Sequence, residues 1–215
     1  MRLRAACVDP CQNRMLGGTF YINLARRKDR REEIEAELER LGLKAERFEA
    51  IERRPGIVGC GLSHLEVLKA ARATGLPNVL VLEDDFEAVV EPAEFWAALE
   101  AFFASPQAAD FDVLMLAYYA PATAPVEGSE LVMKVLEAQT ASAYVVNACM
   151  YDRLIELYEW AIPELQKTGR HWDFANDQVW KRLQPAANWY AYKKRLGKQR
   201  ASYSDTAEQY HDYGV

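Results

Sequence analysis

The sequence predicts an α/β protein built on a mainly parallel sheet flanked by helices. Runs of β-branched, aromatic and aliphatic residues alternate along the chain with segments that have apolar residues at helical spacing. One run, NVLVL at 78–82, is short, apolar and bounded by turn residues, which is typical of a strand buried on both faces of a parallel sheet. No period of 20 to 50 residues recurs, so repeat architectures are excluded.

The individual elements follow from the same patterns. Four segments carry an apolar face at helical spacing, and glycine or proline closes most of them, as Gly42 closes the first. We expect helices at about 25–41, 63–73, 92–103 and 151–160. We expect strands at 19–24, 47–51, 78–82, 112–116, 131–136 and 143–146. The turn-rich stretch 120–130 is predicted to connect elements, either as a mobile loop over the site or as a plain surface connection.

Length, charge and cysteine content restrict the class of protein. The 215 residues are half hydrophobic, so we expect a flexible N-terminal segment at 1–18 followed by a single domain at 19–215. A net charge of -6 argues against a nucleic-acid partner. We find no apolar run typical of a signal peptide or a membrane span, so we expect a cytoplasmic protein. Cys7 and Cys11 lack two convincing further ligands for a zinc site.

Three adjacent carboxylates, Glu83, Asp84 and Asp85, follow the most apolar strand. Ligands of open α/β sheets bind outside the carboxyl ends of strands, where these residues fall. If the strand stays extended, Glu83 and Asp85 point to one side and Asp84 to the other, so two carboxylates can converge on Mn²⁺ or Mg²⁺. The alternative is a solvated acidic turn, but three carboxylates repel one another unless a cation or hydrogen bonds compensate.

Two further segments suit an anionic ligand. In Gly59–His64 the glycines permit close backbone approach, and a helix beginning there would present free N–H groups to a diphosphate. Ser63 with Glu66 also has the form of a simple capping box, and a lone histidine is more often structural. Asn23 and the arginines at 26–31 follow the first strand, where they can bind a nucleotide or form a solvated helix face.

These segments together resemble glycosyltransferase family 25, which groups bacterial lipooligosaccharide galactosyltransferases with collagen β-galactosyltransferases. The similarity begins with three motifs in order: INLARRKDR at 22–30, GCGLSH at 59–64 and VLEDD at 81–85. It continues through three further segments: 139–157, 177–185 and 196–205. The resemblance implies a GT-A-like, Rossmann-like fold and an inverting transferase. Such an enzyme moves a hexose, galactose or glucose, from a UDP-sugar to a hydroxyl of a glycan, protein or lipid-linked sugar.

The resemblance also implies roles for individual residues. Asp85 with Glu83 is expected to hold the metal, which would stabilise the departing diphosphate. The expected donor-binding residues are Asn23, Arg27, Arg30, Ser63, His64, Glu83, Asp84 and Gln199.

The acceptor hydroxyl needs a general base, for which HWDFANDQVW at 171–180 offers Asp177 and Asp173. In a continuous helix these two would share a face, and the family pattern favours Asp177; Asp173 has a helix cap as its alternative role. Tyr144 and Trp172 are the candidates for stacking on the acceptor sugar, although either can instead fill the core. Two other functions remain open: a lapsed UDP-sugar binder and a UDP-sugar hydrolase.

Overall fold

A six-stranded sheet forms the centre of the computed structural model, which describes residues 15–204 and 209–211. The strand order is β2–β1–β3–β6–β5–β7. These strands are β1 (Thr19–Asn23), β2 (Glu46–Glu49), β3 (Asn78–Glu83), β5 (Val113–Pro125), β6 (Val132–Asn147) and β7 (Trp189–Tyr192). Only β6 runs against the other strands of this sheet, so the predicted α/β class with a mainly parallel sheet is confirmed.

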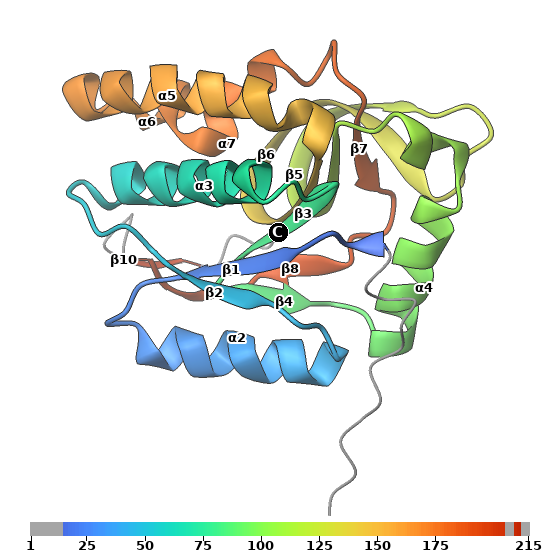
Figure 1. Ribbon diagram of the computed structural model, residues 1–215, viewed down its shortest axis with the longest axis horizontal. Coiled ribbons are helices and arrows are strands. Elements are labelled where there is room, and N and C mark those ends of the chain that lie inside the picture. Colours follow the sequence, from blue (N-terminus) through green and yellow to red (C-terminus); the bar gives the residue numbers. More distant parts are fainter. Residues whose placement is uncertain (1–14, 205–208, 212–215) are drawn as a thin grey trace, which may run out of the picture.

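Helices cover both faces of the sheet (Figure 1). On one face, α3 (Gly56–Ala73) and α5 (Tyr151–Thr168) lie side by side. On the other face, α2 (Lys28–Leu41) and α4 (Pro92–Phe103) contribute to a second apolar core. The sheet is therefore the middle layer of a three-layer structure, and every central strand has two faces to bury.

The side chains of β3 alternate between the two cores. Val79 and Val81 pack in the core under α3 and α5, whereas Leu80 and Leu82 pack in the core of α2 and α4. All four are fully buried, as the sequence predicts for this strand. The same alternation directs Glu83 towards α3 and residue 84 towards α2.

The second helix begins at Gly56, seven residues before the expected start at Ser63. Gly59 and Gly61 therefore lie inside α3 and not in a loop. A Cβ atom at Gly59 would lie 2.2 Å from the carbonyl oxygen of Ile51, so this glycine allows the helix to pack against the preceding segment. The expectation that a helix begins within 59–64 is wrong, because these residues already lie inside α3.

The stretch expected to connect elements at 120–130 is strand up to Pro125, and only the rest of it connects β5 to β6. β5 continues to Pro125, and the two strand-like pieces beyond it join into one long β6. Beyond Met115, β5 pairs with β6 alone and has irregular register, which tolerates the prolines at 121 and 125. Within β6, Thr140 adopts a positive φ of 79°, so the strand is locally distorted there.

Short elements complete the described chain. They are β4 (Phe86–Ala88), β8 (Gly197–Gln199), β9 (Ser202–Ser204), β10 (Gln209–His211), α6 (His171–Phe174), α7 (Asn176–Val179) and the 3₁₀ turns Pro106–Ala109, Ala148–Met150 and Trp180–Arg182. β4 pairs with β8, which carries the late chain back to the end of β3.

The N-terminal region is described from Met15 onward. Leu16 is buried, and the Gly17 amide donates a hydrogen bond to Asn78 Oδ1 at 2.9 Å. Cys7, Cys11 and the rest of 1–14 lie outside the described residues. None of the helices in the described part of the chain has the length and apolar character needed to cross a membrane.

Candidate active site

The acidic triplet lies where β3 ends, beside the end of β1. Glu83 is the last residue of β3 and pairs in register with Ile22 of the parallel strand β1. Asp84 and Asp85 form a turn, and β4 begins at the next residue. The expectation that Glu83 and Asp85 share one side of an extended strand is wrong, because this turn interrupts the alternation after Asp84.

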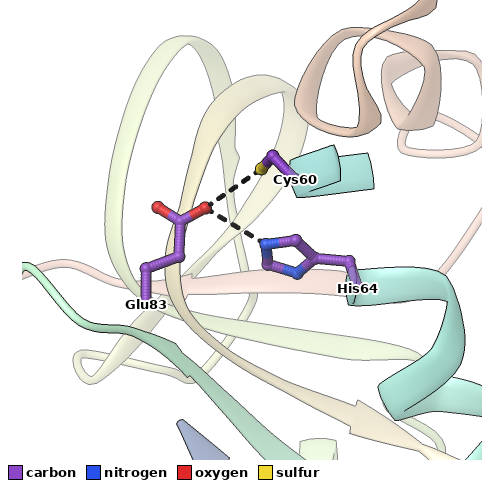
Figure 2. Close-up of side chains that lie close together, drawn as sticks. All are labelled: Cys60, His64 and Glu83. Atoms are coloured by element: carbon purple, nitrogen blue, oxygen red, sulfur yellow. Dashed lines mark hydrogen bonds and ion pairs between the residues drawn. The ribbon is translucent and has the colours of Figure 1, made fainter. Parts of the chain in front are cut away.

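Glu83 points towards α3, and Figure 2 shows its two contacts there. Its Oε1 lies 3.1 Å from His64 Nε2 and 3.5 Å from Cys60 Sγ. The other ring nitrogen of His64, Nδ1, lies 2.7 Å from the Tyr144 hydroxyl. Burial raises the pKa of Glu83, but the contacts with His64 and the Cys60 thiol, together with the charge of Arg30, outweigh burial and leave the pKa below its usual value. Glu83 is therefore held as a carboxylate.

Asp84 and Asp85 face Arg30 of α2. Arg30 Nη1 donates to Asp84 Oδ1 at 2.8 Å and to Asp85 Oδ2 at 3.1 Å, and all three side chains are nearly buried. Asn23 Nδ2 donates to Asp84 Oδ2 at 2.8 Å, and Gln199 Nε2 donates to Asp85 Oδ2 at 3.0 Å. One guanidinium thus links the two carboxylates, while β1 and β8 each supply one amide.

The electrostatics of Asp85 suit a cation. Burial, assisted by the charge of Glu83, raises the pKa of Asp85 to about 7 although Arg30 opposes the shift. Burial also raises the pKa of Asp84. Among the described residues, no donor reaches the buried Oδ1 atom of Asp85. A buried carboxylate oxygen without a donor is costly, and a bound cation would satisfy it.

Asp177, one of the two candidate bases, lies near enough to Glu83 to be affected by its charge. Burial raises the pKa of Asp177, and the charge of Glu83 adds to the shift. Its Oδ2 accepts a hydrogen bond from the Thr140 amide at 3.1 Å, at the distorted position of β6. The backbone at Ala175 is extended, so α6 and α7 are separate helices, and Asp173 and Asp177 do not share the face of one continuous helix.

Asp173 instead forms an ion pair with Arg170 at 2.5 Å and lies partly exposed on α6. Its side chain caps neither short helix: α6 has Arg170 at its N-cap and α7 has Ala175. The alternative capping role is therefore wrong as well. The geometry leaves Asp177 as the better candidate for a base near Glu83.

Several expected donor-binding residues have structural partners. Ser63 is fully buried, donates to the Gly59 carbonyl oxygen at 2.7 Å and accepts from the Ile51 amide at 2.8 Å, so it neither caps a helix nor presents its hydroxyl to a ligand. Arg27 forms an ion pair with Asp29 at 2.7 Å. His64 is fully buried against Glu83. The helix start at Gly56 removes the free N–H groups expected at 59–61.

The two aromatic candidates differ in exposure. Tyr144 is fully buried, with its ring near His64 and Trp180, so its expected role as a stacking surface for an acceptor sugar is wrong. Trp172 is 61% exposed on α6, where it contacts His171. Of these two candidates, Trp172 alone presents its ring where a ligand can reach it.

The sequence predictions did not include Cys60, which contacts Glu83 in the structure. The residue lies one helical turn before His64 on α3, so both side chains share a face that meets Glu83. Burial and the neighbouring carboxylates raise the pKa of the Cys60 thiol well above its usual value. The side-chain oxygen of Asn176 lies 4.0 Å from its sulfur. The spacing of four residues between Cys60 and His64 could have indicated this pairing, but only with a predicted helix that began before Cys60.

Comparisons with known proteins add little about activity. No protein-family model matches the chain, and no curated protein matches it either. Among solved structures, it is similar to a glycosyltransferase involved in the glycosylation of the major capsid of PBCV-1, at 10% identity, with 89% of this chain and 95% of that chain covered and a TM-score of 0.49. It is also similar to mannose-1-phosphate geranyltransferase from Thermus thermophilus, at 10% identity, 88% and 63% coverage and a TM-score of 0.45. Mouse xyloside xylosyltransferase 1 matches at 11% identity, 79% and 69% coverage and a TM-score of 0.35. Similarity at this level carries no information on substrate or mechanism.

Proposed function

We propose that this chain is a metal-dependent glycosyltransferase that moves a hexose from a UDP-sugar to an acceptor hydroxyl with inversion. The observation that carries the proposal is the acidic triplet at the end of β3, in which the buried Oδ1 of Asp85 has no donor among the described residues. The ordered motifs at 22–30, 59–64 and 81–85 support the same function through their resemblance to glycosyltransferase family 25 and its GT-A-like fold.

The proposed metal is Mn²⁺ or Mg²⁺, held by Asp85 with Glu83. Both ions prefer oxygen ligands, and the second oxygen of Glu83 points away from Cys60 and His64 in Figure 2. Such a cation would neutralise the charge that develops on a departing diphosphate. Arg30 would assist the metal ion, because its guanidinium already neutralises part of the charge of Asp84 and Asp85.

The other roles are distributed around the triplet. Asp177 would take the proton of the acceptor hydroxyl as that oxygen attacks the anomeric carbon; its raised pKa favours this role. Asn23 and Gln199, which hold Asp84 and Asp85, would orient the carboxylates that face the donor. Arg27 would contribute to the nucleotide site, and Trp172 would offer its exposed ring to the acceptor sugar. The acceptor class would be a glycan, a hydroxylated protein or a lipid-linked sugar.

Calorimetry with UDP and Mn²⁺ tests the metal site. We expect Mn²⁺ to strengthen UDP binding to the unmodified chain and to have little effect on Asp85→Asn. The matched control is Glu87→Gln, because Glu87 lies two residues further on and pairs with Lys198 at the surface. Equal UDP affinity with and without Mn²⁺ in the unmodified chain would contradict the metal-dependent function.

UDP release from UDP-galactose and UDP-glucose tests the reaction itself. We expect release to rise when a suitable hydroxyl acceptor is added, and product analysis to show a β-glycoside from the α-linked donor. Release that is independent of every acceptor would indicate a hydrolase. No release from any UDP-sugar across a broad acceptor panel would favour a binding protein without transferase activity.

A further inference from the structure

We propose that Cys60, His64 and Glu83 form a second metal site, one that takes a zinc-type ion and differs from the Asp85 site. Cys60 and His64 come from consecutive turns of α3, and Glu83 comes from the end of β3 (Figure 2). One possible ligand atom from each of these residues lies within 4.8 Å of the other two. The side chains thus already converge from two rigid elements, and no loop has to move to bring them together.

The separations between these atoms match a tetrahedral zinc site. With zinc bonds of about 2.0 Å to nitrogen and oxygen and about 2.3 Å to sulfur, tetrahedral angles place nitrogen and oxygen about 3.3 Å apart and sulfur and oxygen about 3.5 Å apart. The corresponding distances from Glu83 Oε1 are 3.1 Å to His64 Nε2 and 3.5 Å to Cys60 Sγ. An ion can therefore replace the two hydrogen bonds with small movements of the side chains.

The surroundings of His64 also suit a metal ligand. A histidine that binds a metal through one ring nitrogen usually donates its other N–H to a fixed acceptor, which sets its tautomer. The Tyr144 hydroxyl lies 2.7 Å from His64 Nδ1 and can accept a hydrogen bond from Nδ1–H. In that tautomer the Nε2 lone pair is available to an ion held between His64 and Glu83. Asn176 places an oxygen 4.0 Å from Cys60 Sγ, where an amide or a water molecule can complete the tetrahedron.

The ligand types separate this site from the one proposed for Mn²⁺. Thiolate and imidazole favour zinc and similar ions, whereas carboxylates favour Mn²⁺ and Mg²⁺. Binding releases the Cys60 thiol proton to solvent, so a metal-bound thiolate replaces the partly buried thiol. Glu83 offers Oε1 to the zinc-type site and directs its second oxygen away from it.

Cobalt(II) absorption spectroscopy on the metal-stripped, reduced full chain tests this site without any transferase assay. The decisive variant is Cys7→Ser/Cys11→Ser/Cys149→Ser, which keeps Cys60 as the only cysteine of the four. We expect this triple variant to bind one equivalent of Co²⁺ with a near-ultraviolet thiolate-to-cobalt band and the intense visible bands of tetrahedral cobalt. Adding Cys60→Ser to this triple variant is expected to abolish the thiolate band and to weaken zinc binding at least about tenfold.

Two controls distinguish this site from the Asp85 site and from metal binding elsewhere on the chain. Asp85→Asn should keep the cobalt spectrum, even though the proposed function predicts that it loses the effect of Mn²⁺ on UDP binding. Zinc should raise the melting temperature of the triple variant but not that of Cys60→Ser or Glu83→Gln. The proposal is overturned if the triple variant gives no thiolate band, or if zinc leaves its melting temperature unchanged.

Discussion

Replacing Arg30 with alanine should destabilise the protein strongly at pH 8 and much less at pH 5. Arg30 is the cation shared by Asp84 and Asp85, and its removal leaves two buried carboxylates with amide donors only. Breaking a buried ion pair from one side typically costs about 3–5 kcal/mol. We therefore expect the free energy of unfolding of Arg30→Ala to be lower by an amount in this range at pH 8, measured without added metal.

Protonation limits this loss at low pH. A buried carboxylate that has lost its cation can take up a proton and become neutral. For an aspartate with the ordinary pKa of 3.8, protonation costs about 1.6 kcal/mol per group at pH 5 and about 5.7 kcal/mol at pH 8, so the loss of stability per group cannot exceed these values. The pKa of Asp85 is already raised to about 7, so the folded state binds more protons than the unfolded state, and stability falls as pH rises from about 4 to about 7. Without Arg30 that window extends further upward.

Urea unfolding followed by tryptophan fluorescence at both pH values gives the comparison. Arg31→Ala is the matched control, since Arg31 lies next on the same helix, is half exposed and pairs with Glu35. The free energy of unfolding of Arg31→Ala should be lower by only about 0.3–0.5 kcal/mol. The reasoning is refuted if Arg30→Ala loses no more than Arg31→Ala at pH 8, or if its loss is as large at pH 5 as at pH 8.

Three further predictions address the base, the metal site and the packing. Asp177→Asn should lower kcat for UDP release at least about 100-fold while leaving UDP affinity unchanged. The control, Asp173→Asn, should keep most of the activity. Similar losses of kcat in both variants would exclude Asp177 as the base. Mn²⁺ affinity should fall about tenfold per pH unit below 7, because a proton competes for Asp85, and a flat calorimetric profile from pH 5 to 8 would contradict this. Gly59→Ala should lower the melting temperature by an amount equivalent to about 1–3 kcal/mol, because the new Cβ atom meets the Ile51 carbonyl oxygen. In Gly61→Ala the nearest contact of the new Cβ atom is 3.4 Å, to the Ile162 side chain, so the melting temperature should fall less. Equal shifts in the two variants would contradict the packing argument.

Most strands of the sheet and most helices could be predicted because their signals are local, whereas β7 has no counterpart among the expected strands. The alternation in 78–82 gives a strand with two apolar faces, and Gly42 does end the first helix, with a φ of 66°. Pro92 likewise marks the start of α4. The start of α3 could not be predicted in the same way. The requirement for glycine at 59 comes from Ile51, and a contact between segments leaves no periodic signal in the sequence.

The candidate site was predictable in part for the same reason. The position of the acidic triplet followed from the end of a buried strand, but its partners did not. Whether Arg30 binds a phosphate or neutralises Asp84 and Asp85 depends on how α2 packs against the sheet. Tyr144 illustrates the same limit, since an aromatic residue in a strand can face a ligand or the core, and here it faces His64 inside the core.

The alternation along β3 ties the chemistry of the protein to the register of its central strand. A slip of one residue would exchange Glu83 and Asp84, so that Glu83 would face Arg30 and Asp84 would face His64. The same slip would exchange the valines and leucines between the two cores. The alignment that buries the valines and the leucines in their own cores therefore also turns Glu83 towards His64 and Asp84 towards Arg30.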